Sequence, residues 1–264
     1  MPSDKSTSGH KDGGEIALLF SGGLDTTIEA VERLEAYRAV HLVTFDNGCC
    51  INLNAGRRRA MELVARFGED RIHHTLVRTA PLIKALMTRY RRSAEKARSP
   101  LVFDLACKMA GLAELICYAR SRGIGDVSDG SAMEQTQIFL QHPEFSAHVE
   151  PFVRSCGLRL LRPLRFDMSR PSKIRLLEEL GFESGPSVFE KLHVTSQLFH
   201  QPFCLRGIVT FFFTSPLRHI RFIRSRSLPM EQAKALWDSL LPGVEEHIER
   251  RAAEDPERPG PEAR

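Results

Sequence analysis

IALLFSGGLDTT, residues 16–27, is the stretch of sequence that decides the fold. Its first five residues form a continuous apolar run of strand length, which is typical of a strand buried on both faces. A turn with two glycines follows, and helical spacing is expected over residues 26–37. A strand, a glycine turn and a helix in immediate succession predict the first unit of an α/β fold.

The alternation of strand and helix patterns continues to about residue 180. Further strands are predicted at 40–45, 72–77, 126–128 and 158–161. Further helices are predicted at 55–67, over a long region after residue 77 whose second half is clearest across 105–116, and at 172–180. This order predicts a Rossmann-like, doubly wound α/β fold, with a parallel five-stranded sheet covered by helices on both faces. A last helix is predicted over residues 230–250, where apolar residues recur on one face.

The length of the chain, 264 residues and 29.8 kDa, leaves room for one large domain and a small extension. Prolines and a change of character mark a boundary after about residue 183. We expect a disordered tail at residues 1–14, an α/β domain at 15–185, a small, mostly helical C-terminal extension at 186–251, and a second disordered tail at 252–264.

The composition excludes several classes of protein. Hydrophobic residues make up 42% and charged residues 27%, which argues against global disorder and fibrous repeats. No apolar run approaches the roughly 20 residues that a membrane span needs. The polar, glycine-rich N-terminus does not resemble a signal peptide. We therefore expect a cytoplasmic protein with no membrane partner.

The glycine turn after the first predicted strand is suited to binding an anion. Gly22 and Gly23 let the backbone approach a ligand closely and adopt positive φ. Amides at the N-terminus of the following helix point at an anion, and the helix dipole favours negative charge there. Asp25 would repel a phosphate unless a cation lies between them, which suggests Mg²⁺. Three hydroxyl donors flank the turn: Ser21, Thr26 and Thr27.

Residues 21–27 resemble the signature of the PP-loop ATP pyrophosphatases, SGGxD followed by Ser or Thr. The resemblance implies that the loop holds the pyrophosphate of ATP while the α-phosphate adenylates an oxygen of an acceptor. It implies ATP and Mg²⁺ as cofactors, a catalytic and metal-binding role for Asp25, and a place for Asp46 near the adenosine. The alternative is a glycine-rich capping turn that binds no ligand.

The resemblance extends over residues 15–185. DVSDGS, residues 126–131, is similar to the family's second element, a strand that ends in an Asp-Gly turn beside the nucleotide. Asp129 would then hold Mg²⁺ or orient the acceptor, and a simple turn residue is the equal alternative. Residues 162–164 and 172–175 resemble the family's late strand and its lysine-bearing helix. Lys173 is expected to reach a phosphate, or else to be a solvated lysine.

Two of the six cysteines stand where sulfur-transferring members of the family use theirs. Cys107 and Cys204 look like the cysteines of tRNA thiouridine synthetases and of the sulfurtransferase for the nickel-pincer cofactor. Asp104 replaces the first cysteine of the pair in those relatives, so a CxxC disulfide or metal site is excluded. The catalytic cysteines implied are Cys204 and Cys107, with burial as the alternative for each.

The residues near Cys107 also suggest a reactive thiol. A cysteine at the start of a helix and next to Lys108 is expected to have a lowered pKa, and a thiolate is the nucleophile that sulfur delivery needs. The roles of Cys49 and Cys50, on the loop after the second strand, stay open. Cys117 and Cys156 are predicted to be packing residues.

The charge distribution bears on possible partners. The formal net charge is +4 and the pI about 8.8. Two basic stretches, 78–98 and 206–226, suit either a phosphate backbone or solvated helix faces. The partners expected are therefore a small-molecule acceptor or RNA, with a sulfur donor protein. A homo-oligomer is a further option, because the apolar face of the last helix is either core or a dimer contact: Leu236, Trp237 and Leu240.

Three functions follow from these patterns. The favoured one is an ATP-dependent enzyme that adenylates an acceptor, releases pyrophosphate and transfers sulfur through a cysteine to RNA or a small metabolite. The second is a PP-loop ligase or amidotransferase that uses nitrogen. The third is a non-catalytic nucleotide-binding or RNA-binding relative that keeps the fold.

Overall fold

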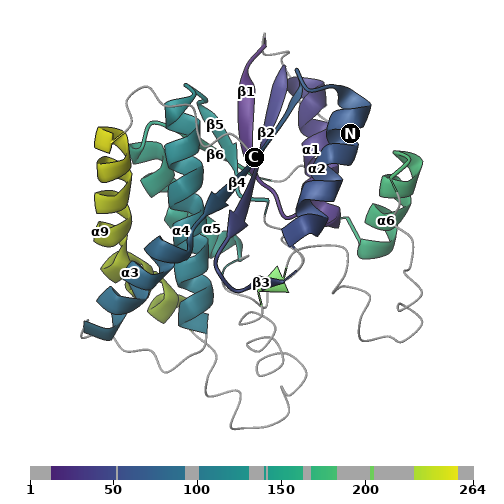
Figure 1. The fold of residues 1–264 in the computed structure, drawn as a ribbon. Coiled ribbons are helices and arrows are strands. Elements are labelled where there is room, and N and C mark those ends of the chain that lie inside the picture. The colour runs from purple at the N-terminus through teal and green to yellow at the C-terminus, as the bar shows by residue number, and fades with distance from the viewer. Residues whose placement is uncertain are drawn as a thin grey trace, which may run out of the picture.

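A five-stranded, all-parallel sheet forms the centre of the protein, in the strand order β4-β2-β1-β5-β6 (Figure 1). The computed structural model describes residues 13–51, 53–92, 101–130, 140, 142–162, 168–182, 203–204 and 229–254. The strands of the sheet are β1 (Glu15–Leu19), β2 (Ala39–Asp46), β4 (Ile72–Arg78), β5 (Asp126–Ser128) and β6 (Arg159–Leu161). The predicted doubly wound α/β fold is confirmed.

Helices cover both faces of this sheet (Figure 1). They are α1 (Leu24–Ala36), α2 (Leu53–Phe67), α3 (Ala80–Arg92), α4 (Leu101–Ser121), α5 (Pro143–Ser155), α6 (Arg170–Glu179) and α9 (Met230–Glu254). A short antiparallel pair, β3 (Cys50–Ile51) with β7 (Phe203–Cys204), lies outside the main sheet. This pair and α5 have no counterpart among the predicted elements.

The side chains of β1 explain why the sheet is covered on both sides. Ile16, Ala17 and Leu18 are fully buried. Successive side chains of a strand point to opposite faces. Ile16 and Leu18 therefore join the core cluster with residues of α1, α2 and α6, while Ala17 joins the cluster with residues of α3, α4, α5 and α9. A continuous apolar strand thus supplies two cores, as its sequence predicts.

The last helix completes the second of these cores. Trp237 is buried and makes edge-to-face contacts with Phe145 and Phe152 of α5, at ring-centroid distances of 5.7 and 6.1 Å. An ion pair of 2.8 Å between His247 and Glu114, both buried, joins α9 to α4. The apolar face of the last helix is therefore core, although the division of the chain at residue 185 stays a prediction.

The ends of the chain fall mostly outside the described part. Residues 1–12 and 255–264, which make up most of the two predicted tails, are not among the described residues. α9 runs to Glu254, three residues into the tail predicted at 252–264. Within the described ranges no helix is both long and apolar enough to cross a bilayer. The cytoplasmic location stays a prediction.

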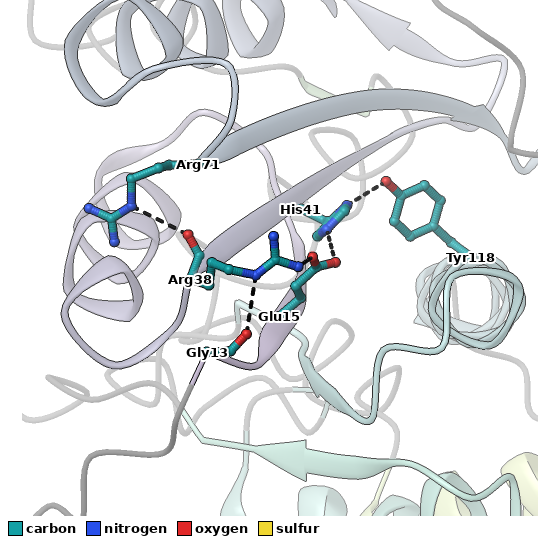
Figure 2. Close-up of polar contacts among 6 residues, drawn as sticks. All are labelled: Gly13, Glu15, Arg38, His41, Arg71 and Tyr118. Atoms are coloured by element: carbon teal, nitrogen blue, oxygen red, sulfur yellow. Dashed lines mark hydrogen bonds and ion pairs between the residues drawn. The ribbon is translucent and has the colours of Figure 1, made fainter.

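A polar network ties β1 and β2 together at the amino edge of the sheet (Figure 2). The buried ring of His41 contacts Glu15 through Nε2 and the hydroxyl of Tyr118 through Nδ1, each at 2.9 Å. Glu15 also pairs with Arg38. Burial lowers the pKa of His41 to about 4, so the ring is neutral at pH 7.

We predict that the protein loses stability between about pH 6.5 and pH 4. Burial also lowers the pKa of His74 to about 4, and its Nε2 lies 3.0 Å from the hydroxyl of Thr44. In this pH range the unfolded chain binds a proton at His41 and at His74 that the folded chain does not bind. The free energy of unfolding therefore decreases as the pH is lowered from 6.5 to 4, by up to about 3 kcal/mol for each histidine.

Urea unfolding across this range measures the effect. In His74→Asn, the asparagine amide can still bond to Thr44, but the unfolded variant no longer takes up a proton at position 74. Its free energy of unfolding should therefore rise with pH less steeply, by about 1.4 kcal/mol per pH unit at the steepest point. A slope that is the same in the variant and the native protein would contradict the assignment of His74.

Candidate functional site

The turn between β1 and α1 lies at the point where the strand order reverses. β1 continues to β2 on one side, and β5 flanks it on the other. In doubly wound sheets, ligands bind outside the carboxyl ends of the strands at this switch point. The turn is attached to β2 by two hydrogen bonds, from the Phe20 amide to the Val43 carbonyl (2.9 Å) and from the Thr44 hydroxyl to the Phe20 carbonyl (2.8 Å).

Only the first glycine of the turn adopts the positive φ expected of both. Gly22 has a φ of +71°, whereas Gly23, the N-cap residue of α1, has a φ of −74° because it is in the extended conformation that precedes a helix. The Gly23 amide donates to Ser21 Oγ at 3.2 Å. Thr27 Oγ1 donates to the Gly23 carbonyl at 2.7 Å, and Thr26 Oγ1 donates to it at 3.3 Å. The predicted hydroxyl donors thus lie together, and those of Thr26 and Thr27 hold the shape of the turn.

The amides that follow the turn can bind an anion. The first amides of an α-helix have no partner within the helix, and the helix dipole adds partial positive charge at this end. In α1 these amides belong to Leu24, Asp25 and Thr26. They lie at the carboxyl edge of the sheet, which is the position that the sequence predicts for phosphate binding.

Close packing on both sides requires glycine at two positions of the site. A Cβ at Gly22 would lie 2.7 Å from the Cα of Gly56 in α2. A Cβ at Gly130, which follows β5, would lie 2.7 Å from the Leu19 carbonyl and 2.8 Å from Thr26 Cγ2. The predicted Asp-Gly turn therefore packs directly on the loop after β1.

Lys173 of α6 reaches the same loop. Its side chain is only 4% exposed, and its Nζ lies 2.8 Å from Asp25 Oδ1. The alternative of a solvated lysine is therefore wrong. The ammonium group lies at the N-terminus of α1, where it balances the negative charge of the Asp25 carboxylate.

Asp129 is held in a similar way by Lys108 of α4, with which it forms an ion pair. Each of the two predicted metal-binding carboxylates, Asp25 and Asp129, thus contacts a lysine. No group of three or more His, Cys, Asp or Glu side chains within the described part of the chain is arranged to hold a metal ion.

A buried polar cluster behind the loop holds α1 in place. Glu29 accepts hydrogen bonds from Ser128 Oγ (2.6 Å) and from Arg33 Nη2 (3.1 Å). Arg33 Nη2 also donates to the Arg162 carbonyl (2.6 Å). Burial raises the pKa of Glu29, although Ser128 and Arg33 oppose this shift. Sequence reasoning misses this cluster, whose only signal is a Glu and an Arg four residues apart on a predicted helix.

The polar groups of the loop after β2 bond to one another and to neighbouring elements. Asp46 Oδ1 accepts from the Gly48 amide at 2.8 Å, and the Asp46 carbonyl accepts from the Thr79 amide at 2.8 Å. Asn47 Nδ2 lies 3.7 Å from Cys107 Sγ, while Asn47 Oδ1 accepts from Cys50 Sγ at 3.2 Å. Asn47 therefore joins two cysteines at the carboxyl edge of the sheet.

The third cysteine of this region is placed by its backbone. In the β3–β7 pair, Cys204 lies directly opposite Cys50. Cys107 and the strand that carries Cys204 are thus linked through Cys50 and Asn47. Of the two cysteines with open roles, Cys50 belongs to this group.

The reasoning from helix position does not hold for Cys107. α4 is already helical at Leu101, so Cys107 stands in its second turn, beyond the first turn in which the helix dipole acts. Lys108 is paired with Asp129. The packing role predicted for Cys117 and Cys156 is confirmed, because both pack against the core and burial raises the pKa of each thiol, that of Cys117 to about 12.

Comparison with known proteins gives matches among solved structures. A complex of a 4-thiouridine synthetase with RNA and bound ATP matches with 15% identity and a TM-score of 0.53, over 89% of this chain and 53% of that one. The fold is the one that the resemblance to the PP-loop ATP pyrophosphatases predicts. No protein-family model matches the sequence, and no curated protein does.

Two further structures match with lower TM-scores. An NMN synthetase from Francisella tularensis is 16% identical, with a TM-score of 0.46 over 82% of this chain and 87% of that one. A predicted tRNA methyltransferase subunit from Methanocaldococcus jannaschii is 14% identical, with a TM-score of 0.40 over 63% and 75%.

We predict that Gly22→Ala destabilises the protein more than Gly123→Ala. The two glycines have nearly the same positive φ, +71° and +67°, so the backbone strain of alanine is matched. A Cβ at Gly123 meets nothing within 4 Å, whereas one at Gly22 meets the backbone of α2. The additional loss should be about 1–3 kcal/mol in urea unfolding. Equal losses would show that the loop does not need its close contact with α2.

Proposed function

We propose that the protein is an ATP pyrophosphatase of the PP-loop type, which adenylates an acceptor and releases pyrophosphate. The observation that carries this proposal is the glycine turn after β1, which brings the first amides of α1 to the switch point of the sheet, where the buried Lys173 of α6 contacts Asp25. The amides would donate hydrogen bonds to a bound phosphate, and the positive ammonium group of the lysine would attract its negative charge.

The reaction is a displacement at the α-phosphorus of ATP. An oxygen of the acceptor forms a bond to this phosphorus, the bond to the bridging oxygen breaks, and pyrophosphate leaves with the electron pair. Negative charge therefore grows on the β- and γ-phosphates. The amides of Leu24 and Asp25, with Lys173, stabilise that charge because they are already oriented toward it.

Magnesium enters this proposal together with the nucleotide. Mg²⁺ is usually held by one or two carboxylates and by the phosphates of a substrate, so a complete cage of protein ligands is not needed. Asp25 and Asp129 are the carboxylates that would hold it, and both flank the loop. When bound, the metal would neutralise charge between Asp25 and the phosphates.

Identification of the products tests the adenylation proposal. With ATP, Mg²⁺ and a set of candidate acceptors, the protein should form AMP and pyrophosphate in equal amounts. Asp25→Asn should lower the rate on the order of 100-fold. The control, Glu35→Gln, changes an exposed residue on the same helix and should leave the rate unchanged. Formation of ADP and phosphate would contradict the proposal, and no turnover with any acceptor would favour the non-catalytic relative.

We further propose that the adenylated acceptor receives sulfur through Cys204 and Cys107. The terminal sulfur of a persulfide on Cys204, supplied by a donor protein, bonds to the activated carbon, and AMP leaves. The Cys107 thiolate then bonds to Cys204 Sγ, the link to the product sulfur breaks, and a small thiol reduces the resulting disulfide. The contact of Asn47 with Cys107 and the pairing of β3 with β7 support this grouping.

Cysteine substitutions test the sulfur step separately from adenylation. Cys204→Ser and Cys107→Ser should each abolish the thiolated product, while AMP and pyrophosphate still form. Cys156→Ser, which alters a cysteine packed against the core, is the matched control and should keep full activity. Full product formation in both of the first two variants would exclude transfer by these cysteines, and product formation with ammonia in a cysteine-free variant would favour the nitrogen-using ligase.

A further inference from the structure

We propose that the exposed side of α3 binds the phosphate backbone of an RNA acceptor. This inference rests on the proposed function, because it names the class of molecule that the site would adenylate. Its basis is a groove with a volume of about 460 Å³ along α3. Six residues line it: Pro81, Lys84, Ala85, Thr88, Arg89 and Arg92.

The spacing of these residues forms two parallel rows. Lys84, Thr88 and Arg92 follow one another at four-residue intervals, so they lie on the same side of the helix. Pro81, Ala85 and Arg89 are also spaced four residues apart and form a second row beside the first. With a rise of 1.5 Å per residue, the cations extend over about 12 Å. This suits a chain of phosphates better than a single small anion.

The charge on this helix is unbalanced. α3 carries Lys84, Arg89, Arg91 and Arg92 and no acidic residue, and all four are exposed. None of the four forms an ion pair with any residue that the structure describes. Some other exposed basic residues of the described part do have acidic partners, as in the pairs Arg154–Glu150 and Lys234–Glu144. The cations of α3, by contrast, stand on a helix that carries no acidic residue to pair with them.

A second cavity of about 310 Å³ extends the groove toward α9. The two share Pro81, Ala85 and Arg89, and the second adds Arg250 and His247. One acidic residue, Glu246, lies on its border. The net charge along the combined surface is positive, as binding of a polyanion requires.

The start of α3 lies next to the loop after β2, at the carboxyl edge of the sheet. The helix begins directly after Thr79, whose amide donates to the carbonyl of Asp46. A Cβ at Gly48 would lie 3.2 Å from the Cβ of Ala80. The 13 residues of α3 span about 20 Å from this edge of the sheet. An RNA strand on α3 would therefore reach the carboxyl edge of the sheet, where the proposed adenylation site lies.

The chemistry of the surface favours RNA over a membrane. The apolar residues of α3, including Leu82, Ile83 and Leu86, are buried in the core, so no apolar face is left to enter a lipid layer. Within the described ranges the large exposed apolar residues are Met61 and Leu76, and neither lies on α3.

RNA binding by charge-matched variants tests the proposal. The probe is a fluorescent single-stranded RNA of about 20 nucleotides, measured between 50 and 200 mM salt, with the DNA of the same sequence as competitor. The test variant is K84Q/R89Q/R92Q. The control, R120Q/R122Q/R154Q, removes the same charge from exposed positions outside α3. All of these side chains are exposed, so both variants should fold.

The test variant should lose about 2 units from the slope of log affinity against log salt, because three phosphate contacts are lost at about 0.7 each. At physiological salt this corresponds to roughly 10- to 100-fold weaker binding, while the control binds like the native chain. Both variants should still bind magnesium pyrophosphate, which is the readout for the loop rather than the groove.

Three results would overturn the proposal. The first is equal RNA binding by the two variants, and the second is tighter binding of the DNA competitor than of the RNA. The third, with anionic vesicles or polyglutamate as alternative polyanions, is that the test variant binds those more weakly but binds RNA as the native chain does. Failure of the proposed function looks different: the native chain would bind RNA through α3 and form no pyrophosphate from ATP.

Discussion

The close approach of three backbone segments around the turn after β1 is the constraint on which the rest of the structure depends. Gly22 lies against Gly56 of α2 on one side, and Gly130 lies against Leu19 and Thr26 on the other. Side chains at these glycines would force the segments apart. Because the turn is enclosed, the first amides of α1 keep a fixed direction, and a site of this kind needs no reorganisation when charge develops on a bound ligand.

The charges of the protein divide between the two edges of the sheet. At the carboxyl edge, Lys173 and Lys108 balance the carboxylates of Asp25 and Asp129, so each of these two pairs carries no net charge. At the amino edge, Glu15 and the neutral His41 form a network whose function is to hold β1 and β2 in register. The proposed adenylation site and this network thus lie at opposite edges of the sheet.

The sequence predicts the parallel sheet and the turn between β1 and α1 because both have strong local signals, a continuous apolar run and a pair of glycines. It does not predict β3 and β7, since a pair of two-residue strands has no periodicity. The burial of Lys173 depends on how α6 packs against α1, which no local pattern encodes. The helix start expected at Cys107 is wrong, because α4 begins at Leu101. The Ser-Pro pair at residues 99–100 is a start signal that the apolar pattern alone does not reveal.

Amide chemical shifts of the ¹⁵N-labelled protein, recorded during a titration with magnesium pyrophosphate, test the central claim most directly. If the turn holds the departing phosphates, the amides of Leu24 and Asp25 shift and saturate, while those of Gly123 and Gly157, in turns elsewhere, stay unchanged. Amides of the turn that do not move, or shifts confined to the basic helix α3, would contradict the account.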